Sequence, residues 1–232
     1  MTFNATIPTL EEDASFGAYI ARPQGTPKAA IIVIQEIFGV NPGIRQKCDK
    51  LAADGYLACA PDLFWRLQPQ VSLDPDVESE FNQALDLMGK FNQDAGIRDI
   101  QATIDFLRDS EGTAKVGCVG YCLGGRLAYM TAARTSIDAS VGYYGVGIDG
   151  LLHEKEAIAN PLLLHIPTED GFVSRETQAA MHKGLDDHPR VTLFDYQGLD
   201  HGFATETGKR RDEDAANLAD SRTAAFFVEH LG

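Results

Sequence analysis

VGYCLGGRLAYM, residues 119–130, is the most informative segment of this chain. It continues the apolar run KVGCVGY (115–121) and then becomes helix-forming, so it predicts a buried strand that turns sharply into a helix. Residues 120–124 have the pattern Gly-x-Cys-x-Gly, which is typical of a turn that presents a nucleophile. The glycines are required because side chains two positions from the nucleophile would collide with neighbouring backbone. The candidate nucleophile is Cys122, at a position where this turn usually carries serine.

Strand-like and helix-like segments alternate on both sides of this turn. The run AAIIVIQ (29–35) is continuously apolar and rich in β-branched residues, as expected of a strand buried on both faces of a parallel sheet. The other expected strands are residues 16–22, 56–62, 115–121, 139–145, 161–167 and 191–197. The expected helices are residues 43–54, 76–92, 97–109, 123–134, about 175–186 and 212–230. This alternation predicts an α/β fold, a mostly parallel sheet flanked by helices on both faces, in a single domain over residues 1–232.

Composition narrows the class of protein. The net charge of −14 disfavours binding to nucleic acid or to an anionic membrane, because both repel an acidic surface. There is no apolar run of 18 residues, and MTFNATIPTL (1–10) does not have the pattern of a signal peptide. The four cysteines lack the spacing of a small disulfide-rich domain, so they are expected to be thiols in a reducing cytoplasm.

The position of Cys122 favours a reactive sulfur. It is expected at the N-terminus of a helix, where the positive end of the helix dipole favours a thiolate. The backbone N–H of Leu123 is then a natural donor to an oxyanion. The alternative is a buried structural cysteine in a glycine-rich turn. Cys118 is expected in the core, and a metal pair with Cys122 is disfavoured because no neighbouring His or Cys completes a usual ligand set.

A thiol nucleophile needs a base, and nucleophile, acid and histidine follow one another in this order in α/β-hydrolases. Asp170 lies a few residues beyond one expected strand, and His201 directly follows the last strand. His201 could take the thiol proton while Asp170 orients its ring. Alternatively, Asp170 is a turn residue before Gly171, and His201 is a capping or packed histidine. Glu169 and Asp200 are nearby competitors for the role of the acid.

Several longer segments form a more specific pattern than the turn alone. They are QEIFGVN (35–41), APDLF (60–64), GYCLGG (120–125), VGYYGVG (141–147), EDGFV (169–173) and DHGF (200–203). With these segments the chain resembles the dienelactone hydrolases, a family of the α/β-hydrolase superfamily, over nearly its whole length. The resemblance implies hydrolysis of an ester or lactone without a metal or cofactor.

The resemblance also assigns roles to individual residues. It implies a catalytic triad of Cys122, Asp170 and His201. Glu36 would be an extra catalytic residue that helps to generate the thiolate when substrate arrives, and the N–H of Ile37 would join that of the residue after the nucleophile in an oxyanion hole. Glu36 directly follows an expected buried strand, where partial desolvation would raise its pKa and make it a better proton acceptor. The alternative is a solvated carboxylate at the rim.

The residues expected to recognise substrate depart from the family pattern. Family members that act on dienelactone hold the substrate carboxylate with two arginines, and this chain has Phe81 and Thr205 at those positions. Leu85 and Met88 stand where the family often has aromatic residues. The expected substrate-contacting residues are Phe81, Leu85, Tyr144 and Thr205. Three other cations could replace the arginines: Arg66, Arg126 and Lys209.

The sequence therefore predicts an enzyme that hydrolyses a small ester or lactone, different from dienelactone, through a cysteine acyl-enzyme. A thioesterase of the same chemistry is one alternative, and a non-catalytic protein that binds or senses a small molecule is another. The expected partner is a small-molecule substrate only, with the chain as a monomer or weak homodimer.

Overall fold

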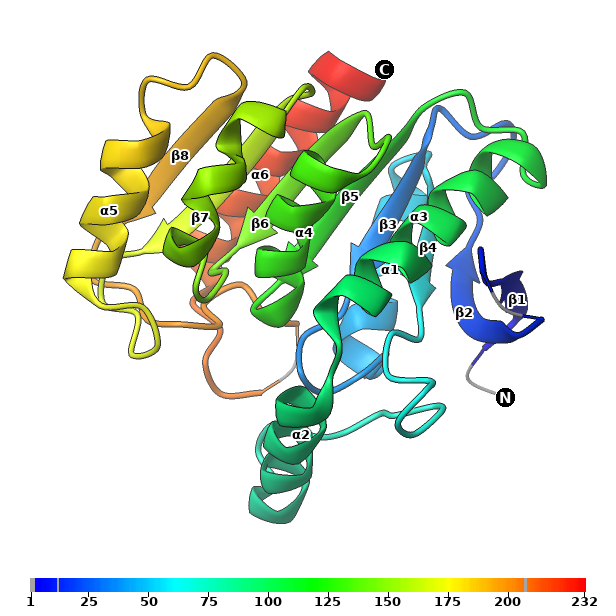
Figure 1. Ribbon diagram of the computed structural model, residues 1–232, viewed down its shortest axis with the longest axis horizontal. Helices are drawn as coiled ribbons and strands as arrows, with labels where there is room; N and C mark the ends of the chain where they lie inside the picture. Colours follow the sequence, from blue (N-terminus) through cyan, green and yellow to red (C-terminus); the bar gives the residue numbers. More distant parts are fainter. Residues whose placement is uncertain (1–2, 12, 207) are drawn as a thin grey trace.

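The computed structural model describes residues 3–11, 13–206 and 208–232, and in this part of the chain eight strands form one sheet (Figure 1). Their order across the sheet is β1-β2-β4-β3-β5-β6-β7-β8. The strands are β1 (Ala5–Pro8), β2 (Ser15–Ala21), β3 (Ala30–Ile34), β4 (Leu57–Pro61), β5 (Val116–Tyr121), β6 (Ala139–Tyr143), β7 (Leu162–Pro167) and β8 (Val191–Tyr196). β2 pairs antiparallel with both of its neighbours, and every other pairing is parallel. The predicted α/β fold with a mostly parallel sheet is confirmed.

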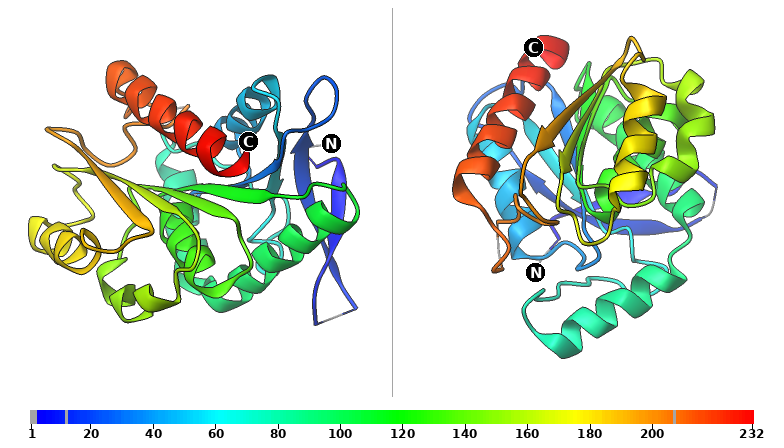
Figure 2. Two further views of the ribbon diagram at one scale, coloured as in Figure 1. Left: turned by 90° about the horizontal axis from the view of Figure 1, so that it is seen from above. Right: turned by 90° about the vertical axis from the view of Figure 1, so that its left-hand side faces the viewer.

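Helices cover both faces of the sheet (Figure 2). One face packs against α3, α4 and α5, and the other against α1 and α6, each through its own apolar cluster. The helices are α1 (Pro42–Ala53), α2 (Glu78–Lys90), α3 (Gln93–Asp109), α4 (Leu123–Arg134), the 3₁₀ segment η1 (Asp149–Ala157), α5 (Arg175–Leu185) and α6 (Glu213–Leu231). No helix in the described part of the chain combines the length and apolarity needed to cross a membrane.

Three segments differ from the sequence prediction. β1 was not predicted, because among its four residues only Ile7 is buried and the alternation is too short to detect. The helix predicted at 97–109 begins at Gln93, since the side chain of Asn92 accepts the N–H three residues on at 3.0 Å and caps it. The 3₁₀ segment at 149–157 was also not predicted, and it buries only one residue.

The topology brings the candidate site together at one edge of the sheet. β3, β5 and β7 are parallel, wholly buried strands, and their carboxyl ends lead directly to Glu36, Cys122 and Asp170. β8 is parallel to β7 and leads to His201. Helix α2 projects beyond this edge and lies apart from the helices that cover the faces (Figure 1). The candidate residues therefore lie at the edge of the sheet beyond which α2 projects.

Candidate active site

Cys122 occupies a strained turn between β5 and α4. Its backbone has φ 55° and ψ −114°, a region that residues other than glycine rarely adopt and that costs about 1–3 kcal/mol. Hydrogen bonds on both sides hold the turn. The N–H of Cys122 donates to the carbonyl of Tyr143 at 3.1 Å, and its own carbonyl accepts from Gly125 at 2.9 Å and from Arg126 at 3.2 Å. The backbone is thus fixed with the sulfur facing out of the sheet edge.

The glycines of the turn allow backbone segments to approach closely. A Cβ on Gly120 would lie 1.9 Å from the carbonyl oxygen of Gly124, so no larger residue fits there. A Cβ on Gly124 would lie 2.4 Å from the carbonyl oxygen of Ile34 at the end of β3. These contacts are to backbone, which cannot rotate away. The spacing of glycines around the cysteine therefore reflects the packing of α4 against the central strands.

His201 and Asp170 form a buried hydrogen-bonded pair. Nδ1 of His201 lies 2.9 Å from Oδ2 and 3.2 Å from Oδ1 of Asp170. Burial disfavours the charged ring, but hydrogen bonds to Asp170 and Cys122 outweigh this effect and raise the pKa of His201 to about 10. Since Nδ1 faces the carboxylate, Nε2 is the ring nitrogen available to the sulfur. Tyr144 and Phe172 pack edge-on against the ring, with centroid distances of 4.9 and 4.8 Å, and restrict its rotation.

The two competing carboxylates are engaged elsewhere. Oδ1 of Asp200 accepts the backbone N–H of Gly171 at 2.8 Å and that of His201 at 2.7 Å, so Asp200 joins the two segments that carry the pair. Glu169 lies at the surface and is paired with Arg175. Of these three carboxylates, Asp170 is the one that contacts Nδ1 of His201.

A large cavity opens at this edge of the sheet. Its volume is about 670 Å³, and Cys122, His201 and Glu36 border it. The apolar part of its lining consists of Ile37, Phe38, Phe81, Leu85, Met88, Leu123, Val146 and Phe172. Thus the structure brings six of the predicted site residues around one space: Cys122, His201, Glu36, Phe81, Leu85 and Thr205. Asp170 does not border it and reaches it only through His201. Tyr144 is not part of this lining, because it is buried behind the ring of His201.

Glu36 lies where the large cavity meets the protein interior. Burial raises the pKa of its carboxyl, while the positive charges of His201, Lys47 and Arg210 act in the opposite direction. Within the described residues its carboxylate has no hydrogen-bond partner. A carboxyl group with a raised pKa beside a thiol and an imidazole is suited to proton transfer near neutral pH. Ile37 and Leu123 also border the cavity, and Leu123 is the first residue of α4, so its N–H has no acceptor within the helix.

The three cations considered as replacements for the arginines differ in location. Arg66 is not in the lining: it pairs with Asp99 and stacks over the ring of Trp65 at 4.2 Å. Arg126 borders the cavity, but its guanidinium donates to the side chain of Gln93 at 2.8 Å and to loop carbonyls. Lys209 borders the cavity.

Arg210 is a further cation of the lining that the sequence prediction missed. Its guanidinium donates to the carbonyl of His201 at 3.3 Å, lies 3.8 Å from Asp200 and stacks over Phe172 at 5.7 Å. The sequence feature that could have indicated this cation is the basic run at 209–211, which follows His201 by eight residues. In the described ranges, no three His, Cys, Asp or Glu side chains come together in a way that could hold a metal ion.

Comparison with known proteins agrees with the fold and identifies the family. A family model described as "Dienelactone hydrolase family" matches residues 16–231. A putative carboxymethylenebutenolidase of Azospirillum brasilense is 43% identical over 228 residues, covering 95% of this chain and 96% of the relative. The carboxymethylenebutenolidase of Pseudomonas putida is 37% identical over 215 residues, covering 92% of this chain and 91% of the relative.

A solved structure gives the same result. The crystal structure of a putative dienelactone hydrolase from Klebsiella pneumoniae superimposes with a TM-score of 0.84 at 28% identity and covers 97% of both chains. The sheet order, the turn at Cys122 and these matches over nearly the whole chain agree. This chain therefore belongs to the dienelactone hydrolase family and has its α/β-hydrolase fold.

Proposed function

We propose that this protein hydrolyses small, neutral esters or lactones through an acyl-enzyme on Cys122. The observation that carries the proposal is the convergence of Cys122 and the His201–Asp170 pair on one large, mainly apolar cavity. The curated relatives named carboxymethylenebutenolidase support a lactone as the first substrate to test. The four cysteines are free thiols, which supports a reducing compartment such as the cytoplasm.

Acylation begins with proton transfer from Cys122. Glu36 or Nε2 of His201 accepts the thiol proton, and the thiolate attacks the carbonyl carbon of the substrate. The tetrahedral oxyanion is stabilised by the N–H groups of Ile37 and Leu123. The C–O bond then breaks, and the leaving alkoxide takes a proton from the protonated base. In a lactone the alkoxide remains attached to the acyl group.

Deacylation reverses these roles. His201 takes a proton from water, and the resulting hydroxide attacks the thioester. Asp170 stabilises the imidazolium and keeps Nδ1 protonated throughout. The C–S bond breaks, and the thiolate leaves and can be reprotonated, so that one water is consumed for each ester bond cleaved.

The lining of the large cavity favours a substrate without a charge near the scissile bond. Phe81 and Thr205 are uncharged lining residues at positions where, by the family resemblance, members that act on dienelactone have arginines. Arg210 is half-exposed and already engaged by Asp200 and Phe172. A carboxylate that entered would lose hydration without a bidentate partner, which is unfavourable.

Mass spectrometry and kinetics together test this proposal. The protein is incubated separately with an activated acetate ester, with the thioester of acetate and with a neutral lactone. The acylated peptides are then mapped. We expect ester or lactone turnover and transient acylation of Cys122. Cys122→Ala should lose turnover, while Cys118→Ala, which alters a buried cysteine of β5, should retain it. Ligand binding without turnover in the wild type would contradict the proposal.

A further inference from the structure

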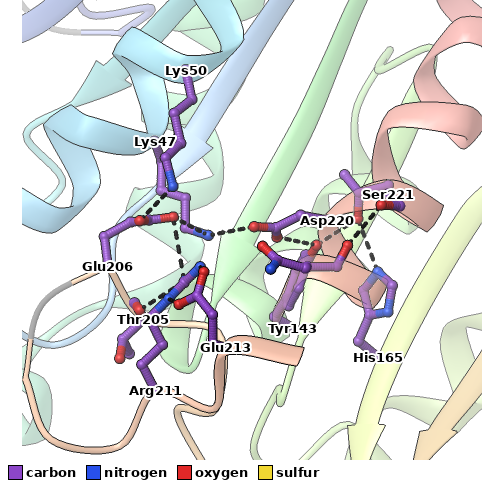
Figure 3. Close-up of polar contacts among 12 residues, drawn as sticks. Lys47, Lys50, Tyr143, His165, Thr205, Glu206, Arg211, Glu213, Asp220 and Ser221 are labelled. Carbon is purple, nitrogen blue, oxygen red and sulfur yellow. Dashed lines mark hydrogen bonds and ion pairs between the residues drawn. The ribbon is translucent and has the colours of Figure 1, made fainter. Parts of the chain in front are cut away.

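A buried lysine lies behind the candidate active site. The side chain of Lys47, on α1, is only 7% exposed. Its ammonium lies 2.9 Å from Oε1 of Glu206 and 3.4 Å from Oδ2 of Asp220 (Figure 3). It also lies over the ring of Tyr121, 4.9 Å from the ring centroid. A lysine removed from water needs such partners to remain charged. Its position is therefore fixed by residues of three other segments.

Glu206 is the main partner and belongs to the segment that carries His201. Its side chain is 6% exposed and is surrounded by cations: besides Lys47, Lys50 lies 2.6 Å away and Arg211 lies 3.7 Å away. Burial opposes the charge of Glu206, but the charges of Lys47 and Lys50 outweigh burial and lower the pKa of this carboxyl. Figure 3 shows these side chains converging from α1 and from the segment before α6. The ion pair thus joins α1 to the histidine segment.

A second, small cavity separates this ion pair from Glu36. Its volume is about 10 Å³, and Glu36, Lys47, Tyr144, Thr205 and Glu206 all border it. The hydroxyls of Tyr144 and Thr205 are buried there and have no hydrogen-bond partner in the described part of the chain. A space of this size holds about one water molecule. The charges that border this cavity therefore interact with little screening by solvent.

We propose that Lys47 and Glu206 are positioning residues that set the charge state of Glu36 from behind, Lys47 favouring its carboxylate form and Glu206 limiting that effect. Neither residue borders the large cavity, so neither contacts substrate. The inference concerns Glu36 itself, and only its consequence for turnover rests on the proposed function.

The effect of each charge has a defined sign. Burial raises the pKa of Glu36, and the positive charge of Lys47 lowers it. Lys47→Met removes this cation and leaves Glu206 and Asp220 less neutralised, so the pKa of Glu36 rises further. Glu206→Gln leaves Lys47 less neutralised, so the pKa of Glu36 falls. The other titratable or charged groups that face Glu36 stay unchanged in both variants: His201, Arg210, Cys122, Tyr121 and Tyr144.

Carbon-13 NMR titration of side-chain carboxyls tests this inference on the intact protein. The resonance of Glu36 is assigned by its loss in Glu36→Gln. We expect its midpoint to rise by about half a pH unit or more in Lys47→Met and to fall by a similar amount in Glu206→Gln. Lys50→Met is the matched control, because Lys50 pairs with the same Glu206 but is 53% exposed and does not border the small cavity. Its shift should be less than half that of Lys47→Met.

Turnover against pH gives the second measurement. If Glu36 accepts the thiol proton, the acid limb of kcat moves with the NMR midpoint, up in Lys47→Met and down in Glu206→Gln. A midpoint that stays constant, or moves in the same direction in both variants, overturns the inference, as does an equal shift in the Lys50 control. If Lys47→Met does not fold, Glu206→Gln must still lower the midpoint and Lys47→Arg must keep it. If no ester is hydrolysed, the proposed function fails while the NMR titration still decides the inference.

Discussion

Replacing Phe81 and Thr205 together with arginine would place two cations in the lining of the large cavity, where the protein has two uncharged side chains. Phe81 lies on α2, the helix that projects beyond the sheet edge, and Thr205 lies four residues after His201. The two positions therefore belong to different segments that border the same cavity. We expect the double variant to shift substrate preference from neutral lactones toward lactones that carry a carboxylate.

The magnitude follows from one newly formed bidentate pair. A charge-assisted pair of hydrogen bonds contributes about 1.5–3 kcal/mol. Because about 1.4 kcal/mol corresponds to a tenfold change, the ratio of kcat/KM for the anionic and neutral substrates should rise roughly tenfold to a hundredfold. Arg210 already lies in the lining and reduces the gain to the extent that it contacts the same carboxylate.

The assay is kinetics on a matched pair of lactones that differ only by a carboxylate, with the wild type and the double variant measured at the same pH and ionic strength. A wild type that already prefers the anion would refute the reasoning. Arg210→Gln and Lys209→Gln would then show which cation of the lining binds the carboxylate.

Three further predictions concern Cys122, His201 and the turn between β5 and α4. Brief treatment with iodoacetamide should label Cys122 first, because the other cysteines are buried and burial raises the pKa of each; peptide mapping that finds another cysteine labelled first would contradict its accessibility. His201→Ala should lower ester turnover by at least ~10³-fold in steady-state assays, and a wild-type kcat would remove His201 from the mechanism. Gly124→Ala should destabilise the fold by about 1–3 kcal/mol or more in urea denaturation, since its Cβ would lie 2.4 Å from the carbonyl oxygen of Ile34; unchanged stability would show that α4 can move away from β3.

The features that the sequence could predict are those with a local signature. The glycine spacing around Cys122 reports a backbone contact within a few residues, and the apolar runs of β3 and β5 report burial on both faces. These local patterns were sufficient for strands β2 to β8 of the sheet, for the turn and for the approach of His201 to Asp170, because strand ends of a parallel sheet meet at one edge.

The features that were missed depend on residues far apart in the chain. Lys47 and Glu206 are separated by more than 150 residues, and neither belongs to a motif, so their contact could not be inferred from spacing. The basic run around Arg210 was visible, but its direction depends on how the loop after His201 folds back over Phe172. A charged residue in an amphipathic helix such as α1 is normally read as exposed, and only the packed structure shows that Lys47 is buried.

Thr205 borders both the large and the small cavity, whereas Phe81 borders only the large one. Under the proposed function, a change at Thr205 would therefore affect both substrate selection and proton transfer. An arginine at position 205 would bring a cation to the boundary between the two cavities, close to Glu36, so Thr205→Arg alone should lower the NMR midpoint of Glu36 as well as favour anionic substrates. Phe81→Arg alone should change substrate preference and leave that midpoint unchanged. Measuring both quantities in both single variants separates the two roles. If Phe81→Arg moved the midpoint of Glu36 as far as Thr205→Arg, the two cavities would not be electrostatically distinct. The pKa of Glu36 would then respond to any added cation, wherever in the lining it lies.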